Sequence, residues 1–152
     1  KQITMRFGKT LLVTAILLLA CIVPAGAAHT EPQMQFEILT TDELTDSSRA
    51  PPIYGDVRQG ETDSYSYTPG NERTLELSLT WDRTSGNSLD IHIHQPNSNS
   101  VILNDGDDGR IDGKISLRTS LTSDMTNRIW MVEVVGALVS GTESYTLIIN
   151  SY

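Results

Sequence analysis

Residues 75–81 read LELSLTW, and this stretch decides the fold class. Its apolar side chains alternate strictly with polar ones, which is the period of a β-strand with one buried face. The same alternation recurs in 89–94 (LDIHIH) and 130–135 (WMVEVV), and a fourth stretch at 145–149 closes the chain. Shorter candidate strands lie at 64–67, 101–103 and 114–118.

Segments rich in Gly, Pro, Asn and Ser separate these stretches, and nothing after residue 52 has the 3.6-residue period of a helix. The pattern predicts an all-β fold, an antiparallel β-sandwich of the jelly-roll or Greek-key type. Trp81 and Trp130 are in phase with the inward residues of their strands, so we expect both indoles in the core. The tyrosines Tyr54, Tyr65 and Tyr67 are candidates for an exposed aromatic patch, with packing at an edge strand as the alternative.

The beginning of the chain differs from the rest. A short basic flank precedes an uncharged run at 10–23, and small residues follow at 24–28. This is the pattern of a secretory signal peptide. We therefore expect a signal helix within residues 1–27, cleaved after Ala27, with 1–4 as an upstream extension.

Two alternatives exist for this leader. Cys21 ends a short sequence that resembles a bacterial lipobox, so its thiol could carry a lipid anchor. The uncharged stretch from residue 10 to 28 is also just long enough to span a bilayer as an uncleaved anchor. All three readings place the remaining chain outside the cytoplasm, secreted or anchored at the cell surface, so the leader would be its only contact with a membrane.

The charge balance excludes one class of partner. The chain has 11 Lys and Arg against 19 Asp and Glu, a formal net charge of −8. Removal of residues 1–27 takes away three bases and no acids, so the processed chain would carry 8 bases and 19 acids, a net charge of −11, and no cysteine. This excess of acid argues against nucleic acid as a partner.

Residues 28–52 are rich in Thr, Ser, Asp and Glu and end in Pro51-Pro52. This composition is typical of a flexible acidic tether with a stiff boundary, which leaves 53–152 as the folded domain. The short apolar patch at 36–39 offers an alternative, in which it adds an edge strand to that domain.

An acidic loop at 104–112 (NDGDDGRID) holds the densest set of oxygen ligands. Clustered carboxylates on a Gly-rich loop suit Ca²⁺, which takes six to eight oxygens in irregular geometry. The alternative is a plain hairpin loop whose Asp, Asn and Gly residues supply turns, with Arg110 offsetting part of the charge. The expected calcium ligands are Asp105, Asp107, Asp108 and Asp112.

A weaker metal site is predicted on the strand at 89–94. Asp90, His92 and His94 have the spacing that places them on one face, and a His-x-His pair with a carboxylate can hold Zn²⁺. The alternative is that these histidines are surface residues. No nucleophile motif is present, so we expect no enzyme.

Several segments together resemble the bacterial and archaeal pre-peptidase C-terminal domain. They cover about residues 53–151, nearly the whole predicted domain. In chain order they are GDVRQGETDSY (55–65), LELSLTW (75–81), SLDIHIHQPNSN (88–99), NDGDDGRID (104–112), IWMVEVVG (129–136) and SYTLIIN (144–150). The resemblance implies a non-catalytic jelly-roll sandwich of secreted proteins, here in a stand-alone form.

The sequence thus favours a non-catalytic, extracytoplasmic binding or adhesion module of a prokaryotic cell surface. Its expected partner is an extracellular protein or polysaccharide, with Ca²⁺ as the one expected stabilising ion. One alternative is a structural envelope subunit that self-associates through edge strands. A further alternative is a metal-dependent enzyme that uses His92 and His94.

Overall fold

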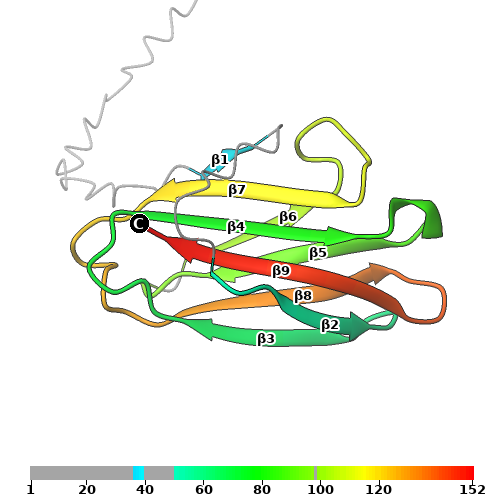
Figure 1. Cartoon of the computed structure of the whole chain (residues 1–152), viewed down its shortest axis with the longest axis horizontal. Helices are drawn as coiled ribbons and strands as arrows, with labels where there is room; N and C mark the ends of the chain where they lie inside the picture. The colour runs from blue at the N-terminus through cyan, green and yellow to red at the C-terminus, as the bar shows by residue number, and fades with distance from the viewer. Residues whose placement is uncertain (1–35, 40–49, 98) are drawn as a thin grey trace, which may run out of the picture. The chain divides into compact units, whose positions relative to one another are not determined.

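A computed structural model describes residues 36–39, 50–97 and 99–152. This part of the chain is all-β, with two antiparallel sheets packed face to face as a sandwich (Figure 1). The expected signal helix, Cys21, Ala27 and most of the predicted tether lie outside the described residues. Within them, no helix is long and apolar enough to cross a membrane.

One sheet has five strands and the other has four, and hydrogen-bonded neighbours run antiparallel throughout. The five-stranded sheet has the order β1 (Phe36–Ile38), β7 (Lys114–Ser120), β4 (Thr74–Trp81), β9 (Glu143–Ser151) and β2 (Ile53–Val57). The four-stranded sheet has the order β3 (Thr62–Tyr67), β8 (Trp130–Leu138), β5 (Ser88–His94) and β6 (Ser100–Asn104). A 3₁₀ turn, η1 (Arg83–Ser85), follows β4.

The seven strands expected from alternation are all present, so the prediction of an all-β sandwich is confirmed. The edge-strand alternative for the patch at 36–39 is also confirmed, because β1 pairs with β7 at one edge of the five-stranded sheet. Strand β2 was missed, because Gly55 in its centre and the prolines before it are typical of a turn. Its partner is β9, and it forms the other edge of that sheet.

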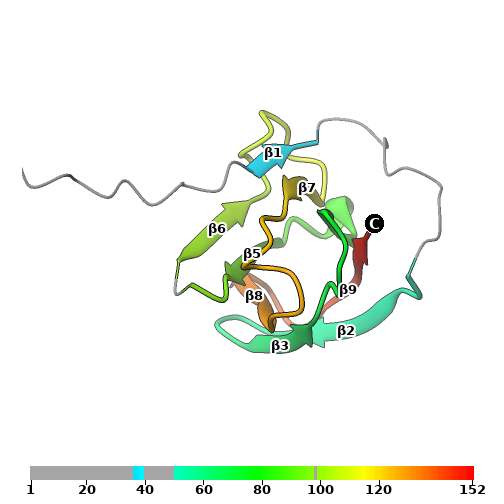
Figure 2. The ribbon, with the colours of Figure 1, turned by 90° about the vertical axis from the view of Figure 1, so that its left-hand side faces the viewer.

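The core lies between the two sheets, which Figure 2 shows along the strands. Apolar residues recur at every second position along β4, β5, β8 and β9 and point inward. These side chains are buried between the two sheets. Both tryptophans belong to this core, as predicted, and each indole N–H finds a backbone carbonyl. Trp81 Nε1 donates to Asn87 O at 3.1 Å, and Trp130 Nε1 donates to Met125 O at 3.3 Å.

Gly55 and Tyr145 make a close contact within the five-stranded sheet, and the Tyr145 hydroxyl connects this sheet to the other one. The two residues face each other across β2 and β9, and a Cβ atom on Gly55 would clash with the Tyr145 hydroxyl oxygen. The buried ring therefore needs a glycine beneath it. Its hydroxyl reaches into the other sheet, donating to Asp63 Oδ2 at 2.6 Å and lying 2.6 Å from the Tyr65 hydroxyl.

We predict that Gly55→Ala lowers the free energy of unfolding by about 1–3 kcal/mol, the usual cost of an extra methyl group in a full core. The cost should shrink in a Tyr145→Leu background, where the ring is gone. Urea denaturation measures both effects, with Ser66→Ala at an exposed position of β3 as the control. A Gly55→Ala protein as stable as the parent would contradict the close contact.

Candidate functional site

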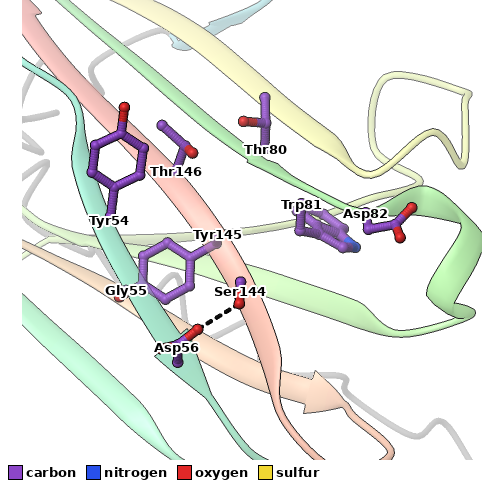
Figure 3. A pocket seen from close by; sticks show the side chains of 9 residues that line it. All are labelled: Tyr54, Gly55, Asp56, Thr80, Trp81, Asp82, Ser144, Tyr145 and Thr146. Atoms are coloured by element: carbon purple, nitrogen blue, oxygen red, sulfur yellow. Dashed lines mark hydrogen bonds between the residues drawn. The ribbon is translucent and has the colours of Figure 1, made fainter.

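The outer face of β2, β9 and β4 carries a hollow of about 480 Å³. Strand register aligns its outward side chains in two rows that cross the three strands (Figure 3). One row runs from Tyr54 over Thr146 to Thr80, and the other runs from Asp56 over Ser144 toward Asp82. We call these six residues the outer-face site.

Tyr54 is the aromatic residue of the site. Its side chain is 75% exposed, whereas Tyr65 and Tyr67 point inward and pack against the core. The Tyr67 hydroxyl lies 2.7 Å from Ser151 Oγ. The expected packing at an edge strand is therefore confirmed for Tyr65 and Tyr67, since the alternation of β3 turns both rings toward the core, and of the three only Tyr54 is exposed as the aromatic-patch hypothesis required.

The two carboxylates of the site are held by hydroxyl groups. Ser144 Oγ donates to Asp56 Oδ1 at 2.5 Å. Asp82 caps η1, where its Oδ1 accepts from the Thr84 hydroxyl at 2.7 Å and from the Thr84 backbone N–H at 2.8 Å. These hydrogen bonds lower the pKa of Asp82 from its ordinary value, so this carboxylate stays ionised well into the acidic range.

The chemistry of the site suits binding. An exposed aromatic ring offers a flat apolar surface, and the hydroxyls and carboxylates beside it can donate and accept hydrogen bonds. Among the lining residues that the structure describes, none is His, Cys, Lys or Arg. Sequence reasoning identified Tyr54 alone, because the other five residues come from three strands whose register the sequence does not state.

The acidic loop between β6 and β7 uses its carboxylates on its own backbone. Asp105 is buried, and its Oδ1 accepts from the backbone N–H groups of Asp112 at 3.2 Å, Gly113 at 3.1 Å and Lys114 at 3.3 Å. Asp107 Oδ2 accepts from the Asn104 N–H at 2.8 Å. This is the pattern of the plain-loop alternative.

Asp108 behaves in the same way, since its Oδ1 accepts from the Arg110 N–H at 2.8 Å. Asp112 Oδ1 is buried without a hydrogen-bond partner. Across the described ranges, no three His, Cys, Asp or Glu side chains are placed to hold a metal ion. Calcium binding by the loop stays a prediction, and the geometry gives its carboxylates a structural task.

Asp90, His92 and His94 lie on the outer face of β5, as predicted, opposite the buried side of that strand. The structure adds a residue that the sequence did not reveal, Glu133 of β8, which stands across from His92 in the ladder. Glu133 Oε2 lies 2.9 Å from His94 Nε2 and 3.8 Å from His92 Nδ1. Glu133 therefore places a carboxylate beside both imidazoles.

Two serine hydroxyls extend the contact between His94 and Glu133. His94 Nδ1 lies 2.9 Å from Ser100 Oγ, and Ser64 Oγ donates to Glu133 Oε1 at 3.4 Å. Burial, its largest influence, raises the pKa of Asp90 on the same face. Zinc binding by Asp90 and the two histidines stays a prediction, as no described trio of such side chains is arranged for a metal.

No protein-family model matches this chain, and no curated protein sequence does either. One solved structure with a similar fold is that of AlgX from Pseudomonas aeruginosa, with a TM-score of 0.45 and 13% sequence identity. The similarity covers 71% of this chain and 27% of AlgX, so the chain spans about a quarter of that protein's length.

We predict that Asp105→Ala lowers the free energy of unfolding by about 1–3 kcal/mol, because three buried or half-buried N–H groups lose their acceptor. Asp108→Ala, at a more exposed position of the same loop, should cost less. Thermal melts with EDTA and with excess Ca²⁺ test the ion in parallel. A Ca²⁺-dependent melting temperature that both substitutions abolish would show that the loop is a calcium site after all.

A second prediction concerns Tyr145. Burial, followed by the hydrogen bonds to Asp63 and Tyr65, raises the pKa of its hydroxyl above the ordinary value of 10.0. In alkali the unfolded chain therefore loses a proton that the folded chain keeps, so stability is full below about pH 10 and falls as the pH rises further.

Tyr145→Phe should cost about 1–3 kcal/mol near pH 7 and should make the decline above pH 10 shallower. Urea denaturation between pH 7 and pH 11 measures both, with Tyr54→Phe as the control for an exposed hydroxyl. An unchanged slope would contradict the role of the Tyr145 hydroxyl.

Proposed function

We propose that this protein is a non-catalytic, extracytoplasmic module that binds a polysaccharide at the outer-face site. The observation that carries the proposal is the exposed ring of Tyr54 beside two cross-strand rows of hydroxyls and carboxylates. A sugar ring has an apolar face that can stack on an aromatic ring and hydroxyls at its edge that need polar partners. The site offers both kinds of contact on one surface.

The shape and polarity of the site favour a sugar over a protein ligand. Protein interfaces centre on apolar and aromatic anchors in well-packed pockets. Five of the six residues of the site are polar and non-aromatic. Trp81 and Tyr145 also line the hollow but are buried, so Tyr54 is the exposed aromatic ring. A partner protein would find little to bury, whereas a polysaccharide gains from repeated polar contacts along an open sheet face.

The resemblance to the pre-peptidase C-terminal domain supports the same class. The segments that carry the resemblance fall on β2 through β9, and a non-catalytic jelly-roll sandwich is what that family implies. The leader supports secretion or attachment at the cell surface. The outer faces of the two sheets would then be the surfaces available to extracellular ligands.

We predict that Tyr54→Ala weakens binding to a retained polysaccharide roughly five- to thirtyfold, as the loss of an exposed aromatic contact of about 1–2 kcal/mol implies. Affinity electrophoresis against a panel of soluble polysaccharides, neutral, amino-bearing and acidic, measures the retardation of parent and variant. Met131→Ala, an exposed apolar residue on the other sheet, is the control and should bind like the parent.

Two outcomes would speak against the proposal. Failure of every polysaccharide in the panel to retard the parent protein would remove its basis. Equal weakening by Tyr54→Ala and Met131→Ala would show that the Tyr54 ring is not the contact. Unchanged melting temperatures of both variants would verify that any loss is one of binding.

A structural envelope subunit is the second candidate. Strand β6 (Ser100–Asn104) is an edge of the four-stranded sheet, and its outward Ile102 is 59% exposed. An edge of this kind can pair with a second copy. Sedimentation at high protein concentration tests it, because a strictly monomeric species would argue against assembly through β6.

A further inference from the structure

We propose that the polysaccharide bound at the outer-face site carries free amino groups. This inference rests on the proposed function and names the chemical class of its ligand. The argument for amino groups is charge complementarity. Two carboxylates bound the site, and none of the lining residues that the structure describes is basic.

The two carboxylates stand on opposite sides of the hollow. Asp56 lies on β2 and Asp82 directly follows β4, with Ser144 of β9 between them. Neighbouring strands are about 4.8 Å apart, so the two acids flank a strip about 10 Å wide. Both are exposed to solvent, so a ligand bound in the hollow would have one carboxylate on each side.

Asp82 keeps its charge when a ligand arrives, because hydrogen bonds from Thr84 hold its pKa below the ordinary value. Asp56 accepts a hydrogen bond from Ser144 Oγ, which fixes the position of its carboxylate. A protonated amine between them would gain charge-assisted hydrogen bonds, whereas the carboxylate or sulfate of an acidic polysaccharide would be repelled.

No Lys, Arg or His is among the described residues that line the hollow. The basic residues nearest in sequence are Arg58 and Arg83, and Lys114 of β7 stands across from Thr80 on the same face, outside the lining. Arg58 Nε donates instead to Thr142 Oγ1 at 3.4 Å, in the turn before β9. The acid excess of the whole chain, 19 acids against 11 bases, adds a long-range attraction for a cationic polymer.

The uncharged part of the site supplies the rest of the recognition. The hydroxyls of Thr80 and Thr146 form a row with Tyr54, beside the row of the carboxylates. A sugar ring stacked on Tyr54 would direct its edge toward both rows. Charge alone would attract any polycation, including a basic peptide. Binding that also depends on the Tyr54 ring indicates a ligand that stacks on it, as a sugar ring does.

The test compares two oligosaccharides of equal length, one of glucosamine and one of N-acetylglucosamine, by isothermal titration calorimetry with the full chain at about pH 5.5, where amines are protonated and Asp is ionised. We expect the glucosamine form to bind roughly tenfold tighter, as for one charge-assisted contact. Asp56→Asn and Asp82→Asn should each reduce this preference, and Asp108→Asn, on the acidic loop, should not.

The outcomes separate this inference from the proposed function. Equal binding of the two sugars, both still weakened by Tyr54→Ala, would overturn the amino-sugar inference and leave the polysaccharide site intact. A preference that Asp108→Asn reduces as much as Asp56→Asn would also overturn it, as an effect of net charge. Absence of binding to both sugars and to the whole polysaccharide panel would overturn the proposed function itself.

Discussion

The contact between Tyr145 and Gly55 is the constraint on which the arrangement of the site depends. The ring can lie flat beneath β2 only because Gly55 has no side chain, and its hydroxyl then joins β9 to Asp63 and Tyr65 of the other sheet. Tyr54 and Asp56 are the two neighbours of Gly55, so the strand that carries two of the six residues of the outer-face site is fixed by this contact. An edge strand held from below in this way can present side chains to a ligand at little entropic cost.

The polar groups of the described residues divide into two kinds. In the acidic loop, Asp105, Asp107 and Asp108 bind backbone N–H groups of the loop itself, and on β5 and β8 the imidazoles and Glu133 bind one another. These side chains bind within the fold. Asp56 and Asp82 are also held by hydroxyl groups, but both are exposed and line an open hollow beside the ring of Tyr54, which is why we place the binding site on that face.

Much of the fold could be predicted from the sequence, because period-2 alternation is a local signal. It identified seven strands, the inward direction of Trp81 and Trp130, and the outward direction of His92 and His94. What it could not supply was register. The approach of Glu133 to His94 and of Thr146 to Tyr54 depends on which residues face each other across strands, and that is decided by long-range packing. Strand β2 could not be predicted for a related reason. A glycine such as Gly55 is typical of a turn, and its place in a strand is explained only by the ring of Tyr145, which packs over it in the folded protein.

Chemical-shift mapping tests most directly where the ligand binds. Titration of the ¹⁵N-labelled protein with a retained oligosaccharide should shift the amide resonances of Tyr54, Asp56, Ser144 and Thr146, and should leave those around His92 and Glu133 unchanged. Shifts concentrated on β5 and β8, or on the acidic loop at Asp105, would contradict the assignment of the outer face of β2, β9 and β4 as the binding surface.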